Sequence, residues 1–247
     1  MPTDLTSKVA LVTGGARRVG RAVALRLAEA GLDVAITYLT GEPEAKQLVA
    51  QIESMGRRAL AIRVDLAEPE AADYVSAQLG VFDGLYVLIN NASSFTPSPL
   101  GQIGVDQYDH HMAVNARAPL MLIQKFASLL AAHDSPGRVV NLIDIHVMGE
   151  PLKGYCAYNA SKAALHEITM TCAAELAPKV TVNAIAPGVI EWAESYTAQQ
   201  RDLYMMRVPL GRPGSPRDAA AAVLYLVRDA DYCTGQVIKL DGGRSLT

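Results

Sequence analysis

The 247-residue sequence lacks a basic surplus and long apolar runs, and each shortage excludes a class of protein. The net charge is −3, which argues against a nucleic-acid partner and against a polybasic membrane anchor. No apolar run approaches the roughly 18 residues that span a bilayer. The polar segment Met1–Lys8 and the short run Val9–Val12 predict no signal-peptide core. We therefore expect a cytoplasmic protein without a membrane or nucleic-acid partner.

Cysteine is also scarce. Three cysteines are present, an odd number at no metal-ligand spacing: Cys156, Cys172 and Cys233. The histidines His110, His111 and His146 show no such spacing either. A reducing location fits this pattern best, and we predict no metal site.

What the chain has is a regular alternation of short β-rich runs and longer helical patterns, in a sequence that is 50% hydrophobic. Strict alternation predicts an α/β fold: one doubly wound domain, residues 1–247, whose seven-stranded parallel sheet has helices on both faces. The predicted strands are Lys8–Thr13, Val34–Tyr38, Ala59–Val64, Leu85–Ile89, Val139–Ile143, Val180–Ile185 and Gln236–Leu240. Predicted helices include Arg18–Ala30, Glu42–Met55, Asp106–Leu130 and Tyr155–Leu176. Ligands of such sheets bind beyond the carboxyl ends of the strands, so the residues after each strand are the candidates.

The loop after the first strand is rich in glycine and opens a helix. It contains Gly14, Val19 and Gly20, although the pattern G-x-G-x-x-G is absent. A helix N-terminus with unpaired N–H groups is a natural pyrophosphate site. On this loop alone, a strand-to-helix turn without a ligand remains an equal alternative.

The charges near this loop favour NADPH over NADH. Arg17 and Arg18 suit a ligand with extra phosphate, unless they are ordinary solvated charges. An NAD site has an acidic residue after the second strand, but here that strand ends at Tyr38 and no carboxylate follows until Glu42.

Further candidates follow the fourth, fifth and sixth strands. Small residues after Asn90-Asn91, namely Ala92 and Ser93, would let a flat ring approach the backbone. Asp144 follows the fifth strand. Tyr158 and Lys162 share one helix face at i, i+4 spacing, where the ammonium would lower the pKa of the phenol and make it a general acid. Pro187-Gly188 forms a rigid turn that could line one side of a nicotinamide ring. Each of these features alone also has a purely structural explanation.

In this order, Gly14…Gly20, Asn90-Asn91-Ala92, Tyr158…Lys162 and Pro187-Gly188 resemble the short-chain dehydrogenase/reductase family, from about Lys8 to the C-terminus. The family usually has glycine where Arg18 stands and serine where Asp144 stands. Both departures, and the segment Asn90–Leu100, resemble the pteridine reductase branch, which includes the dihydromonapterin reductases.

This resemblance implies a Rossmann-type fold and a role for each matching residue. Phe95 would stack on a pterin, while Ser93 and Arg18 would hydrogen-bond the pterin and the cofactor phosphates. Asp144 and Tyr158 would form the acid pair, Lys162 would bind the nicotinamide ribose, and Asn115 would support a water-linked proton path. The remaining cofactor contacts would come from these positions: Gly14, Arg17, Val19, Tyr38, Asp65, Leu66, Asn91, Ala92, Pro187 and Gly188. Residues at about 189–216 would cover the substrate, and a homotetramer is expected.

Three functions follow for testing. The first is NADPH-dependent reduction of a pterin C=N bond, on dihydromonapterin, dihydrobiopterin or dihydrofolate. The second is reduction of a carbonyl or 3-oxoacyl thioester, against which Asp144 and Phe95 argue. The third is a non-catalytic NADPH sensor, against which the intact Tyr158/Lys162 pair argues. Bulky residues of the 189–216 segment, including Trp192, Tyr196, Tyr204, Met205 and Met206, suit a substrate cover and a subunit contact equally well.

Overall fold

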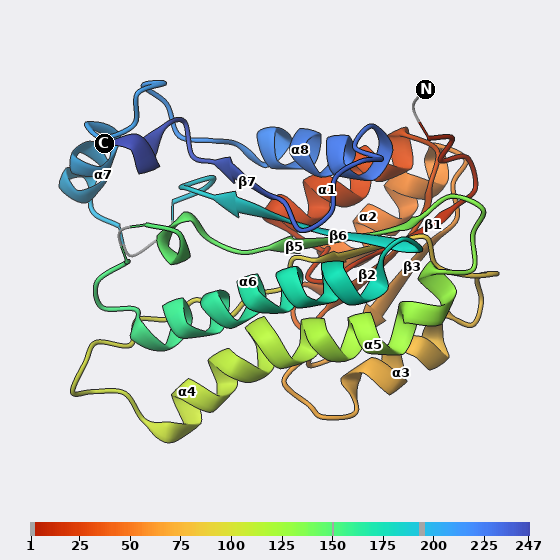
Figure 1. Ribbon diagram of the computed structural model, residues 1–247, viewed down its shortest axis with the longest axis horizontal. Helices are drawn as coiled ribbons and strands as arrows, with labels where there is room; N and C mark the ends of the chain where they lie inside the picture. Colours follow the sequence, from red (N-terminus) through yellow and green to blue (C-terminus); the bar gives the residue numbers. More distant parts are fainter. Residues whose placement is uncertain (1–2, 150, 193–195) are drawn as a thin grey trace.

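The predicted parallel sheet is present in the computed structural model, which describes residues 3–149, 151–192 and 196–247 (Figure 1). Among these residues, seven parallel strands form one sheet in the order β3-β2-β1-β4-β5-β6-β7, which confirms the α/β Rossmann-type fold class. The strands are β1 Val9–Val12, β2 Asp33–Tyr38, β3 Ala59–Arg63, β4 Val87–Asn90, β5 Gly137–Leu142, β6 Val180–Pro187 and β7 Val237–Leu240.

Helices cover both faces of the sheet (Figure 1). One face carries α1 Arg18–Glu29, α2 Glu42–Ser54 and α8 Pro216–Arg228. The other carries α3 Ala71–Leu79, α4 Val105–Met112, α5 Ala118–Leu130 and α6 Cys156–Leu176. The short helix α7 Ala198–Met205 lies near the C-terminus, beyond the end of the sheet (Figure 1). None of the helices in the described ranges is long and apolar enough to cross a bilayer.

The strands are buried on both faces, which explains their continuous apolar sequences. In β1, Ala10 and Val12 point into the core beneath α1, α2 and α8. Val9 and Leu11 alternate with them and enter the opposite core, with Phe126 of α5. This arrangement holds the carboxyl ends of the central strands rigidly at one edge of the sheet.

Two elements differ from the sequence prediction. The single helix predicted for Asp106–Leu130 contains a π-helical turn, Ala113–Arg117, between α4 and α5. Pro119, in the first turn of α5, has no N–H to donate to the preceding turn, so the regular hydrogen-bond ladder changes here. The turn predicted at Pro187-Gly188 is also wrong in part, because β6 continues through Pro187, which pairs with Leu240 of β7.

The strand order reverses between β1 and β4, where chain connections leave in opposite directions. Such a switch point leaves a crevice at the carboxyl ends of the strands.

Candidate active site

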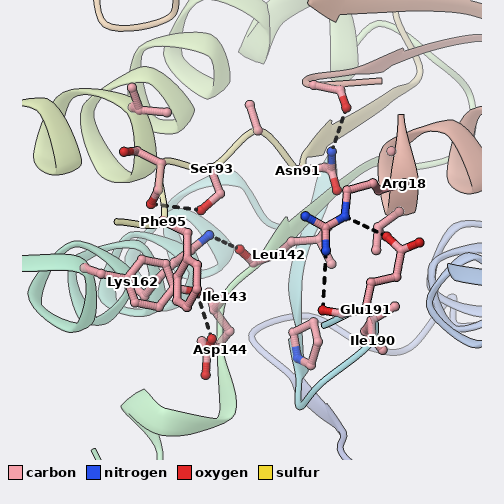
Figure 2. A pocket seen from close by; sticks show the side chains of 18 of the residues that line it. Arg18, Asn91, Ser93, Phe95, Leu142, Ile143, Asp144, Lys162, Ile190 and Glu191 are labelled. Carbon is pink, nitrogen blue, oxygen red and sulfur yellow. Dashed lines mark hydrogen bonds and ion pairs between the residues drawn. The ribbon is translucent and has the colours of Figure 1, made fainter. Parts of the chain in front are cut away.

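A cavity of about 590 Å³ lies at this edge of the sheet (Figure 2). All but one of the site residues predicted from the sequence line this cavity. The lining residues are Gly14, Arg17, Arg18, Val19, Tyr38, Asp65, Leu66, Asn91, Ala92, Ser93, Phe95, Asp144, Tyr158, Lys162, Pro187 and Gly188. The exception is Asn115, which is fully buried behind the cavity wall.

The glycine loop packs tightly against the segment after β4. Gly14 has φ +62°, and a Cβ there would lie 3.0 Å from Cα of Ala92. A side chain at Gly20 would run into the carbonyl of Gly14. Asn91 locks the two segments together, since its side-chain amide donates to the carbonyl of Thr13 (2.8 Å). The backbone of this loop can therefore approach a ligand closely.

Arg18 begins α1 in the left-handed region, with φ +53°. A non-glycine residue there carries strain of about 1–2 kcal/mol, which explains why a glycine suits this position. The guanidinium reaches across the cavity, where Nε donates to the carboxylate of Glu191 (2.7 Å) and a terminal nitrogen donates to the Glu191 carbonyl (3.3 Å) (Figure 2). The sequence analysis did not single out Glu191.

At the end of the cavity formed by β2 and β3, Arg17 donates to the hydroxyl of Thr40 (2.8 Å). Tyr38, Asp65 and Leu66 lie at the same end. The side chain of Arg17 thus lies where β2 ends, in the position from which a 2′-phosphate could be bound.

Tyr158 and Asp144 form a direct hydrogen bond at the opposite end. The buried Tyr158 hydroxyl donates to the Asp144 carboxylate at 2.8 Å, and the other carboxylate oxygen accepts from the backbone N–H of His146 (2.9 Å). Burial, and then the negative charge and hydrogen bond of Asp144, raise the pKa of Tyr158 well above its usual range. The phenol therefore keeps its proton at neutral pH and can act as a proton donor.

The expected lowering of the phenol's pKa by Lys162 is wrong for this structure. Lys162 Nζ lies 5.9 Å from the centre of the Tyr158 ring and donates to the carbonyl of Leu142 (2.7 Å). Burial lowers the pKa of Lys162 itself to about 8, opposed by the charge of Asp144. The i, i+4 spacing places both residues at one site, but burial and Asp144 decide the pKa of Tyr158.

Two buried residues hold the loop after β4 from behind. Asn115, in the π-helical turn, accepts from Ser94 N (2.8 Å) and donates to Ser161 Oγ (2.9 Å). His111 contacts the same loop through the carbonyl of Ser94 (3.2 Å) and the hydroxyl of Thr96 (3.0 Å). His111 was predicted only to be a non-ligand residue, and no local sequence pattern indicates these contacts.

The loop held in this way carries Phe95. The Phe95 ring stacks on Tyr155, with 4.6 Å between ring centres, and meets Tyr158 edge-on at 4.8 Å. Phe95 is 38% exposed, so part of the ring faces the cavity. The sequence analysis missed Tyr155, which supports the ring from behind.

A second aromatic group lines the cavity from the segment after β6. Trp192 packs against Tyr196 (5.5 Å) and Tyr204 (5.4 Å). Met206, in contrast, is 82% exposed, and neither Met205 nor Met206 lines the cavity. Among these bulky residues, Trp192, Tyr196 and Tyr204 thus line the cavity and the two methionines do not. Of the predicted cover at 189–216, positions 193–195 lie outside the described residues.

The fold and this site together define an oxidoreductase of the dinucleotide-binding Rossmann class. The family described as Enoyl-(Acyl carrier protein) reductase matches residues 14–245. A 3-oxoacyl-(acyl-carrier-protein) reductase from Synechocystis sp. is 34% identical over 248 residues, which cover 98% of each chain. The chain belongs to the short-chain dehydrogenase/reductase family.

Solved structures agree with this assignment. A short-chain dehydrogenase from Burkholderia cenocepacia in complex with NADP has a TM-score of 0.89 and 36% identity, covering 98% of this chain and 99% of that one. FolM alternative dihydrofolate reductase 1 from Brucella canis, complexed with NADP, also has a TM-score of 0.89, with 31% identity and coverage of 99% and 97%.

Proposed function

We propose that the protein is an NADPH-dependent pteridine reductase. The observation that carries this proposal is the hydrogen bond from Tyr158 to Asp144, beside the exposed part of the Phe95 ring. A proton donor backed by a carboxylate, next to an aromatic platform, suits a flat heterocycle that is protonated at a ring nitrogen.

The cofactor is NADPH. Gly14 and Gly20 permit the tight packing of the loop that brings its backbone to the cavity at the N-terminus of α1, where the diphosphate would bind, and Arg17 lies where the 2′-phosphate would bind. Lys162, with Tyr158, lies at the end where the nicotinamide ribose would be held. When bound, NADPH supplies a hydride to the substrate.

The chain's own residues supply the rest of the chemistry. The overall reaction is dihydropterin + NADPH + H⁺ → tetrahydropterin + NADP⁺, in which the C=N bond becomes CH–NH. Tyr158 donates the proton toward the ring nitrogen. Asp144 holds the phenol in position and supports the return of a proton to Tyr158. Phe95 and Ser93 orient the heterocycle, and Asn115 holds the loop that carries both of them. The segment 189–216 covers the substrate, and the enzyme acts as a homotetramer.

A second candidate is reduction of a 3-oxoacyl thioester. The similarity to the Synechocystis reductase favours it. A ketone oxygen is held by hydrogen-bond donors, however, and the carboxylate of Asp144 adds none beside Tyr158 in its ionised form. Asp144 and the aromatic lining therefore favour the pterin.

Initial rates of NADPH oxidation test the two candidates, with NADH in parallel. We expect turnover of dihydrobiopterin, dihydromonapterin or dihydrofolate and faster reaction with NADPH than with NADH. Turnover of acetoacetyl thioesters without any pterin turnover would establish the second candidate instead. No turnover of either class, with NADPH binding demonstrated, would favour the sensor.

A further inference from the structure

The bridge between Arg18 and Glu191 crosses the middle of the cavity (Figure 2). Tyr38 and Asp65 lie at one end and Tyr158 and Lys162 at the other, whereas Arg18 starts the helix between them. The middle of a dinucleotide is its diphosphate. Bound at the N-terminus of α1, the diphosphate meets the same guanidinium that Glu191 holds in this structure.

We propose that Glu191 is an internal anion that competes with the cofactor diphosphate for Arg18. Entry of the cofactor exchanges one anionic partner of the guanidinium for another and releases the segment Glu191–Trp192. Trp192 lines the cavity, so the exchange couples cofactor binding to the position of this aromatic side chain. The inference rests on NADPH binding in the proposed function and is independent of the pterin as substrate.

The strength of the bridge suits such an exchange. The side chains of Arg18 and Glu191 are 60% and 37% exposed. Solvent weakens an ion pair of this kind, so a diphosphate with at least two charges and several backbone N–H partners displaces it readily. Arg18 has a left-handed backbone, and its side chain lines the cavity.

The first test is the dissociation constant of NADPH at low salt, measured by titration of nucleotide fluorescence for the wild type and Glu191→Gln. We expect Glu191→Gln to bind NADPH about two- to fivefold more tightly, because the competing carboxylate is gone. In the Arg18→Gly background the same substitution should change binding less than twofold. Asp73→Asn removes a similar charge from an exposed pair with Lys125, neither residue of which lines the cavity, and should leave binding unchanged.

Unchanged or weaker binding by Glu191→Gln would overturn the proposal and leave Glu191 a structural anchor. Equal tightening by Asp73→Asn would also overturn it, because net charge would then be the cause. Failure of the wild type to bind NADPH would instead refute the proposed cofactor, which separates the two failures.

The second test uses Trp192, the one tryptophan of the sequence, as a reporter of the released segment. Saturating NADP⁺ should shift its emission, because Trp192 leaves its packing against Tyr196 and Tyr204. Glu191→Gln without nucleotide should already show part of this shift. An emission spectrum unaltered by bound NADP⁺ would show that the segment stays in place and would exclude the coupling.

Discussion

The two sides of the cavity are held in contrasting ways. On one side, Tyr158 and Lys162 line the cavity and Asn115 lies behind them, and we call these three residues the buried wall. They are at most 5% exposed, and each makes hydrogen bonds of 2.9 Å or less. On the other side, the exposed wall, Arg18 and Glu191 form an ion pair that faces solvent.

This contrast separates two requirements of a reductase. Proton transfer needs a donor fixed within a few tenths of an ångström, which buried and mutually supporting hydrogen bonds provide. Entry and release of a large cofactor need contacts that break at little cost, which exposed charges provide. Substitutions on the buried wall should therefore change chemistry and stability, whereas those on the exposed wall should change binding alone.

The sharpest test of the buried wall is Tyr158→Phe. Loss of the hydroxyl removes the proton donor and should lower kcat about 10²–10⁴-fold, the usual range for a general acid. The dissociation constant of NADPH should change little, since the phenyl ring remains. If the variant kept more than a tenth of the wild-type rate, a group other than Tyr158 would be the proton donor.

Asp144→Ser should have the next largest effect. Serine restores the residue that is usual in the family, but it cannot carry the charge that now accepts from Tyr158. We expect pterin turnover to fall about 10–100-fold, with NADPH binding within twofold. Equal turnover by the variant would refute the role of Asp144, and a gain in thioester reduction would favour the second candidate function.

The distinction between the two walls also explains what the sequence could and could not predict. Tyr158, Lys162 and Asp144 follow strands or share a helix face, so local spacing is enough to place them together. Glu191 is 173 positions from Arg18, and His111 contacts a loop 15 to 17 positions away. Such pairs depend on how the helices pack on the sheet. The pKa of Tyr158 was predicted in the wrong direction for the same reason, because the depth of burial is a property of the whole fold.

The charge of Lys162 gives the buried wall a pH dependence. Its pKa in the folded protein is about 8, below the usual 10.5, so between these values the unfolded chain binds more protons and the stability of the fold rises with pH. Relative to Lys162→Met, the cofactor-free wild type should gain about 2 kcal/mol of unfolding free energy between about pH 7 and about pH 9.5. Urea denaturation of both proteins at both pH values measures this, and a constant difference would contradict it.

His111→Leu should weaken the same wall by a smaller amount. The substitution removes the contacts with Ser94 and Thr96 and should cost about 1–2 kcal/mol of stability. His110 is exposed and adjacent, so His110→Leu is a matched control that should stay within about 0.5 kcal/mol. Thermal unfolding distinguishes the two variants, and equal melting temperatures would show that His111 does not hold the loop.

The smallest stability change is expected for Arg18→Gly on the exposed wall. Glycine relieves strain of about 1–2 kcal/mol at φ +53°, but it loses an exposed ion pair worth about 0–1 kcal/mol and gains freedom in the unfolded chain. These contributions nearly cancel, so the free energy of unfolding should change by less than about 1 kcal/mol. Affinity for NADPH should nevertheless fall severalfold, because the diphosphate loses its guanidinium. A large loss of stability would mean that the bridge to Glu191 supports the fold itself, and the contrast between the two walls would then be wrong.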